Sequence, residues 1–146
     1  MALSYLEKQE QIKKLFASCP DQEARYNLLI SLGKDLKPLA PEWRVTENLV
    51  SGCQSIMYLH SSWEDGKVHY SIYSEALIST GLAALLISVY NGEMPETILK
   101  CPPAFIDEIG IRASLTPGRS NGLASLYLKM KQEALKLLVS HNFIKA

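Results

Sequence analysis

The sequence predicts an α+β fold in which a small antiparallel sheet of about three strands packs against several α-helices. Two runs with a period of two, residues 55–62 and 67–74, flank the turn segment 64–66 and indicate a β-hairpin. Apolar residues recur at helical spacing before and after this hairpin. At 146 residues, 47% of them hydrophobic, the chain has the length and apolar content of a single domain spanning residues 1–146.

Two helices are expected ahead of the hairpin. Residues 5–16 carry apolar side chains at helical spacing. Asp21 is a candidate N-cap for a second helix, which should end before Pro38. The segment 37–43 contains two prolines and is expected to be an ordered connection, and 44–50 is a candidate for the third, outer strand.

The segment after the hairpin predicts a buried helix. Residues 76–90 are apolar nearly all round, and Gly92 follows as a stop signal. The segments 95–100 and 103–109 begin with or contain proline and predict two short helices.

The last segment predicts a long amphipathic helix over residues 123–138, with Ser120 or Asn121 as its N-cap. Arg119 would then stand just ahead of the helix N-terminus. Such a position favours an anion, although an arginine that merely holds its loop through backbone carbonyls fits the same pattern.

The charge balance excludes several functional classes. Lysine plus arginine equals aspartate plus glutamate at 15 each, with no basic block, so nucleic-acid binding is not expected. The polar N-terminus has no apolar signal core, and the apolar stretch 81–89 is too short to cross a bilayer. No membrane partner is expected, and the sequence predicts a cytoplasmic protein.

The cysteines argue against disulfides and metal. Cys19, Cys53 and Cys101 are an odd number without CxxC spacing, and none lies within four residues of a histidine. A reducing compartment is therefore expected, and a structural zinc site is not. No phosphate-loop lysine follows a strand, so a nucleotide cofactor is not expected either.

Cys53 is the candidate reactive residue. It follows Gly52, which permits a sharp turn, and precedes the first hairpin strand. A small buried hydrophobe is the alternative, and the local pattern leaves both open. The three histidines are scattered, so a cysteine hydrolase or transferase lacks an evident base.

Four stretches together resemble the SufE family of sulfur-acceptor proteins, over nearly the whole chain. They occur in the order and at the spacing of that family. The four are 47–50 leading into Gly52-Cys53-Gln54-Ser55, then Ser74-Glu75-Ala76, then 81–86, and last 115–123. The resemblance implies a SufE/IscU-like fold.

The resemblance also implies a function. Cys53 would receive persulfide sulfur from a pyridoxal-phosphate cysteine desulfurase of the SufS or CsdA type and pass it to a downstream iron–sulfur scaffold. The chain would be a carrier that stimulates its partner, with no cofactor or metal of its own and no enzymatic activity. Arg119, Glu75, Gln54, Ser55 and Gly52 would support Cys53. Monomer and homodimer both stay open.

The sequence departs from the family pattern at two positions. Glu75 stands where aspartate is common, which places the carboxylate one methylene further out. Gly118 stands where serine is common, and we expect it to loosen the loop before Arg119. We also expect Cys53 to be shielded in the free protein and to swing out when the desulfurase docks.

Three alternatives are open at this point. An iron–sulfur scaffold would bring several cysteines to one cluster, and only Cys53 lies in a plausible site. A sulfur carrier for thio-cofactor synthesis would share the chemistry and differ in the acceptor. An interaction domain with inert cysteines would tolerate Cys53→Ser.

Overall fold

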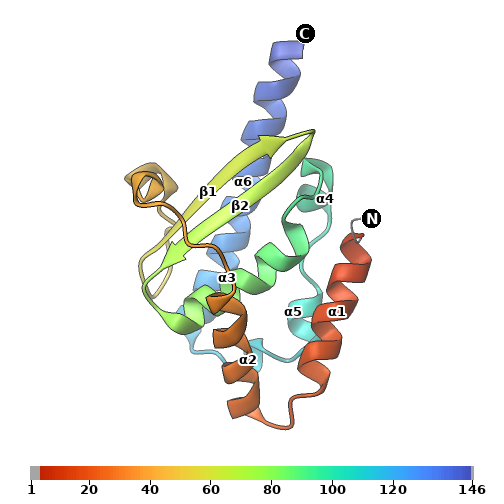
Figure 1. The fold of residues 1–146 in the computed structure, drawn as a ribbon, viewed down its shortest axis with the longest axis vertical. Helices are drawn as coiled ribbons and strands as arrows, with labels where there is room; N and C mark the ends of the chain where they lie inside the picture. Colours follow the sequence, from red (N-terminus) through yellow and green to blue (C-terminus); the bar gives the residue numbers. More distant parts are fainter. Residues whose placement is uncertain (1–3, 146) are drawn as a thin grey trace.

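The computed structural model describes residues 4–145, which form an α+β fold with six α-helices and a two-stranded antiparallel sheet (Figure 1). The fold class predicted from the sequence is confirmed. The elements in chain order are α1 (Tyr5–Ala17), α2 (Gln22–Lys34), the 3₁₀ turns η1 (Pro41–Trp43) and η2 (Thr46–Asn48), β1 (Met57–Glu64), β2 (Lys67–Ser74), α3 (Leu77–Tyr90), α4 (Pro95–Lys100), α5 (Phe105–Glu108), the 3₁₀ turn η3 (Arg112–Ser114) and α6 (Pro117–Lys145).

Side-chain caps define the starts of the first two helices. Ser4 and Glu7 form a capping box at α1, in which each side chain satisfies a backbone N–H of the other residue. The carboxylate of Asp21 accepts a hydrogen bond from the N–H of Ala24 (2.9 Å), so the predicted cap of α2 is confirmed. α2 ends before Pro38, as predicted.

The hairpin forms in the predicted place. Its register runs from Met57 opposite Ser74 to Glu64 opposite Lys67, which leaves a two-residue turn. Asp65 and Gly66 both adopt positive φ, at 53° and 77°. This conformation matches the right-handed twist of the strands and suits an Asp-Gly pair.

The predicted outer strand at 44–50 is wrong. The segment contains the turn η2, and it pairs with β1 through a single bridge, between Leu49 and Tyr58. The side-chain amide of Asn48 donates to the carbonyl of Trp43 (2.7 Å), and such local bonds compete with a strand ladder. A short polar segment with its own turn bonds therefore replaces the third strand.

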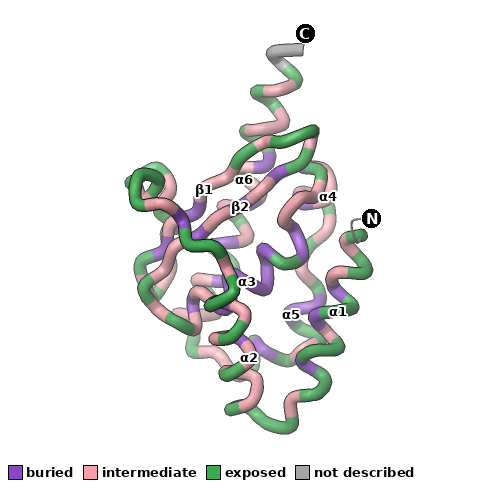
Figure 2. Tube along the Cα trace, viewed as in Figure 1, coloured by how far each residue is buried: buried purple, intermediate pink, exposed green. Residues whose placement is uncertain are grey.

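Helix α3 lies at the centre of the fold, where it contacts α1, α2, α6 and β2. Figure 2 shows that most of its length is buried, as its apolar sequence predicts. A Cβ at Gly81 would lie 2.4 Å from the carbonyl oxygen of Leu29 in α2, and Gly33 of α2 lies beside Gly81. The two helices thus pack backbone against backbone, which only glycine allows at this contact.

Helix α6 begins earlier than the sequence predicted. It starts at Pro117, and the hydroxyl oxygen of Thr116 accepts a hydrogen bond from the N–H of Arg119 (3.2 Å). Proline at the first helical position and threonine before it form an ordinary N-terminus. The predicted caps Ser120 and Asn121 are therefore wrong, and Arg119 lies in the first helical turn.

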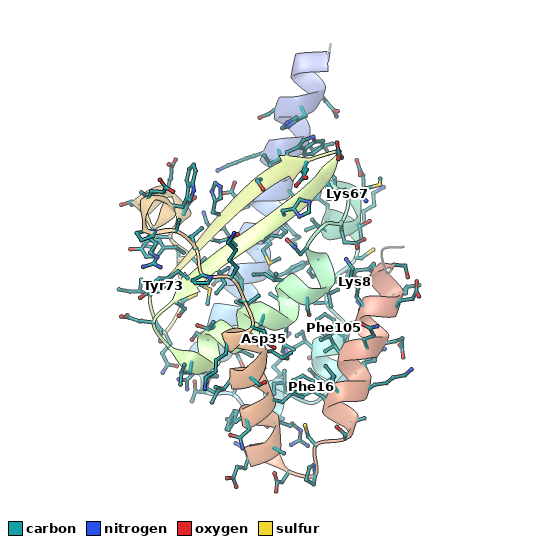
Figure 3. The ribbon with its side chains drawn as sticks, viewed as in Figure 1. Lys8, Phe16, Asp35, Lys67, Tyr73 and Phe105 are labelled. Carbon is teal, nitrogen blue, oxygen red and sulfur yellow. The ribbon has the colours of Figure 1, made fainter. Side chains whose placement is uncertain are left out.

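Helix α6 packs directly against the hairpin, whereas α1 packs against other helices. Helix α6 contacts β1 and β2, and its C-terminal end extends past the hairpin turn (Figure 1). Below the hairpin, α1 packs on α5, where Phe16 and Phe105 are buried (Figure 3). In the part of the chain that the structure describes, we find no helix both long and apolar enough to cross a membrane.

Candidate functional site

Cys53 lies on a short loop, residues 51–56, that leads into β1. The N–H of Val50 donates to the carbonyl of Met57 (2.9 Å) and closes the base of this loop. Gly52 turns the chain with a φ of +82°, a left-handed conformation that favours glycine. The loop therefore has a fixed base, and Cys53 lies at its tip.

The loop rests on the first turns of α6. Small residues at Gly118, Gly122 and Ser125 follow each other at i, i+4 and i+7 and make one flat helix face, which we call the small-residue groove. Three residues of the loop cover it in antiparallel order. On the helix side, a Cβ at Gly118 would lie 2.6 Å from Oε1 of Gln54, and a Cβ at Gly122 would lie 3.5 Å from Sγ of Cys53. On the loop side, a Cβ at Gly52 would lie 2.6 Å from Oγ of Ser125.

Few polar contacts hold the loop in the groove. The hydroxyl of Thr116 donates to Oε1 of Gln54 (3.0 Å). The thiol of Cys53 points at the carbonyl oxygen of Gly122 with Sγ 3.9 Å away, a weak hydrogen bond at most. Gly118 does not loosen a loop, contrary to our expectation, because it lies inside α6 and makes room for the carboxamide of Gln54.

A small cavity adjoins the sulfur of Cys53. Its volume of about 10 Å³ is close to the space that one water molecule needs. Its walls come from the loop, β1, α3 and α6. The lining residues are Cys53, Gln54, Met57, Ser79, Leu82, Arg119, Gly122, Leu123 and Leu126.

The cavity is mostly apolar, and one of its lining residues, Arg119, carries an unpaired donor. Burial raises the pKa of the Cys53 thiol above its ordinary value, because desolvation disfavours the thiolate. Nε of Arg119 is buried, and no hydrogen-bond partner for it exists among the described residues. An unpaired buried N–H is costly and is often kept for a functional reason. The site thus suits a small anion attached to Cys53.

The other predicted site residues are placed differently. Gln54 and Gly52 touch α6, as described above, and Ser55 is half-buried in the loop. Glu75 is exposed on the bend between β2 and α3 and does not line the cavity. The structure therefore joins Cys53, Gln54 and Arg119 and leaves Glu75 on the surface.

The remaining cysteines lie outside the site. Cys19 follows α1 and Cys101 follows α4, both as free thiols, and neither lines the cavity. Within residues 4–145, no group of three or more histidine, cysteine, aspartate or glutamate side chains is arranged to hold a metal ion.

Sequence reasoning assigned no role to Thr116, Gly122 or Ser125. The spacing of Gly118, Gly122 and Ser125 was a usable signal, because it places small residues on one face of a helix. The mistaken start of α6 hid it.

A family model described as "SufE: Fe-S metabolism associated domain" matches residues 10–134. A SufE-like protein of Synechocystis, named as uncharacterised, is 36% identical over 133 residues, which are 91% of this chain and 84% of that protein. The sulfur acceptor protein CsdE of Escherichia coli is 35% identical over 119 residues, which are 80% of this chain and 81% of CsdE.

Two further similarities differ in extent. The SufE-like protein 1, chloroplastic/mitochondrial, of Arabidopsis thaliana is 36% identical over 90% of this chain, which spans 36% of the plant protein. The solution structure of a hypothetical protein from Thermus thermophilus superposes with a TM-score of 0.76 at 30% identity and covers 90% of this chain and 96% of its own.

Proposed function

Because the chain belongs to the SufE family, we propose that it is a sulfur acceptor in which Cys53 takes persulfide sulfur from a cysteine desulfurase for iron–sulfur cluster assembly. The observation that carries the assignment of the site is the cavity beside Cys53. Cys53 and Arg119 both line this space of about 10 Å³, and Arg119 carries a buried Nε–H that has no partner among the described residues, which supports the proposal.

The transfer needs no cofactor in this chain. The Cys53 thiolate attacks the outer sulfur of the donor persulfide, a new S–S bond forms at Cys53, and the S–S bond of the donor breaks. The donor cysteine leaves as a thiolate with the bonding electron pair, and the sulfane sulfur keeps its oxidation state. The proton of the Cys53 thiol is lost to solvent before attack. One S–S bond replaces another, so no external oxidant or reductant enters the balance.

Arg119 would stabilise the product. The outer sulfur of the Cys53 persulfide is anionic near neutral pH and can accept a hydrogen bond from the Nε–H of Arg119. A hydrogen bond to a charged group is stronger than one between neutral groups. The same bond would pair a donor for which the described residues offer no acceptor.

Burial of Cys53 has a protective consequence. A half-buried thiol with a raised pKa reacts slowly with oxidants and with small thiols, because the thiolate is the reactive form. Reaction with a large donor therefore requires the loop 51–56 to move. We propose that docking of the desulfurase draws the loop out of the small-residue groove.

The partners follow from the same reaction. We propose a pyridoxal-phosphate desulfurase of the SufS or CsdA type as donor, an iron–sulfur scaffold as the next acceptor, and a reducing, cytoplasmic compartment, which three free cysteines suit. The chain acts as a carrier and not as an enzyme. The scaffold alternative is weaker, because a cluster needs several thiolates and the cavity is lined by one cysteine.

The test is sulfur uptake measured by mass. The protein is mixed with a cysteine desulfurase and L-cysteine, and the intact mass is taken with and without reductant. We expect a gain of one reductant-sensitive sulfur that is lost in Cys53→Ser and kept in Cys101→Ser. Uptake by Cys53→Ser equal to the wild type would disprove Cys53 as the acceptor.

A further inference from the structure

We propose that Gln54 acts as a latch, whose hydrogen bond with Thr116 holds Cys53 closed in the small-residue groove and whose release presents Cys53 to the sulfur donor. This inference rests on the proposed function for its meaning. The latch itself is a property of the free protein and can be tested without a partner.

Little else holds the tip of the loop 51–56. Within residues 4–145, one conventional hydrogen bond joins a side chain of the loop 51–56 to another element, and it is the bond between Gln54 and Thr116. The contact of Cys53 with the carbonyl of Gly122 is a weak sulfur bond at 3.9 Å. The bond from Val50 to Met57 holds the base of the loop and leaves the tip free to turn.

The side chain of Gln54 fits closely over Gly118. A Cβ at position 118 would lie 2.6 Å from Oε1 of Gln54 and 3.3 Å from its Cβ and Cδ. The carboxamide thus occupies the space that a side chain would otherwise fill. A residue larger than glycine at position 118 would therefore displace the carboxamide of Gln54.

Thr116 makes two hydrogen bonds through one hydroxyl group. Its oxygen accepts the N–H of Arg119 as the N-cap of α6, while its hydroxyl proton is directed at Gln54. One side chain therefore connects the loop that carries Cys53 to the helical turn that carries Arg119. Opening of the latch leaves the N-cap in place, so the loop moves while Arg119 stays fixed.

The free-energy difference between the closed and the open loop 51–56 is therefore small. Gln54 and Thr116 are both exposed. Loss of one neutral hydrogen bond at such a site corresponds to about a two- to tenfold change in the equilibrium between closed and open loop. A bond of this strength keeps Cys53 covered most of the time and yields readily to a docking partner.

The experiment measures alkylation of Cys53 by iodoacetamide in the free protein, site by site, by peptide mass. Gln54→Leu keeps the bulk of the side chain and removes the acceptor, and we expect it to speed alkylation of Cys53 about two- to tenfold. Thr116→Ser keeps both hydrogen bonds and is the matched control, with a rate expected within about twofold of the wild type. Cys19 and Cys101 serve as internal references, since a general loosening of the fold would change their rates as well.

A second variant separates opening from unfolding. Gly118→Ala displaces the flexible end of the Gln54 side chain and meets no backbone atom of the loop within 3.3 Å, so Cys53 should react faster although the thermal midpoint is little changed. An unchanged rate in Gln54→Leu, or an equal acceleration in Thr116→Ser, would refute the latch.

Sulfur uptake from a desulfurase, measured on the same proteins, distinguishes the two proposals. Faster alkylation without uptake in any protein would leave the latch standing and refute the proposed function. If the wild type took up sulfur but neither Gln54→Leu nor Gly118→Ala sped alkylation of Cys53, the proposed function would stand and the latch would be refuted.

Discussion

Arg119→Met is expected to separate stability from sulfur acceptance. Methionine keeps a long, flexible side chain beside the cavity, and it removes the buried Nε–H that has no partner among the described residues. Most substitutions at a half-buried position destabilise a protein. Arg119→Met should instead leave the free energy of unfolding unchanged or raise it, because an unpaired polar group is removed while the packing of the aliphatic part of the side chain is largely kept.

The magnitudes follow from the state of that one group. An unsatisfied buried donor costs about 1–3 kcal/mol, so the free energy of unfolding should stay the same or rise by up to about 2 kcal/mol. A rise of 1 kcal/mol corresponds to roughly 2–4 °C in Tm for a chain of this size. A hydrogen bond to the anionic persulfide is worth about 1.5–3 kcal/mol, so sulfur acceptance should fall about 10- to 150-fold.

Two measurements on the same preparations test this expectation. Thermal unfolding gives Tm, and mass-resolved sulfur uptake from a desulfurase gives the rate and yield of the Cys53 persulfide. Arg112→Met is the matched control, because Arg112 is exposed and pairs with Asp107 on the surface (2.9 Å). Exposed pairs contribute little, so the control should change neither quantity much.

Two results would refute the reasoning. If Arg119→Met accepted sulfur at the wild-type rate, the guanidinium would have no role at the persulfide. If the variant lost several kcal/mol of stability, the Nε–H of Arg119 would be satisfied in solution, and the argument from an unpaired donor would fail.

Two further predictions concern the thiol and the core. Burial raises the pKa of the Cys53 thiol, so less thiolate is present at neutral pH. The rate of alkylation should rise with pH, and the midpoint of this rise should lie above that of an exposed thiol. A midpoint at or below that of glutathione would contradict the burial. Gly81→Ala would place a Cβ 2.4 Å from the carbonyl oxygen of Leu29, and we expect a net loss of about 1–2 kcal/mol in urea unfolding, because the strain exceeds the gain of about 1 kcal/mol in helix propensity. Gly122→Ala, whose Cβ would make contacts of 3.5 Å and longer, is the control and should not be destabilised.

Local patterns determined most of the secondary structure. The hairpin was predictable, because the period of two and the Asp65-Gly66 turn act on neighbouring residues and agree with each other. The cap at Asp21 and the buried helix α3 were predictable for the same reason. The errors fell where two local signals compete, at the turn η2 and at the start of α6, where Thr116 with Pro117 prevailed over Ser120 and Asn121 as the helix start.

The candidate site divides in the same way. The sequence by itself determined that Cys53 follows a glycine turn ahead of a strand, and the motifs around it indicated the family. Only the tertiary structure decided what surrounds the sulfur. Gln54 and Thr116 are 62 residues apart, and Cys53 lies 69 residues from Gly122, so no local pattern relates them.

The physical reason is that the reactivity of a thiol depends on its surroundings and not on its neighbours in sequence. Burial, the size of the cavity and the unpaired Nε–H of Arg119 all result from how α6 packs under the loop of Cys53. Desolvation and hydrogen bonding act through space, over a few ångströms, between groups that the fold alone brings together.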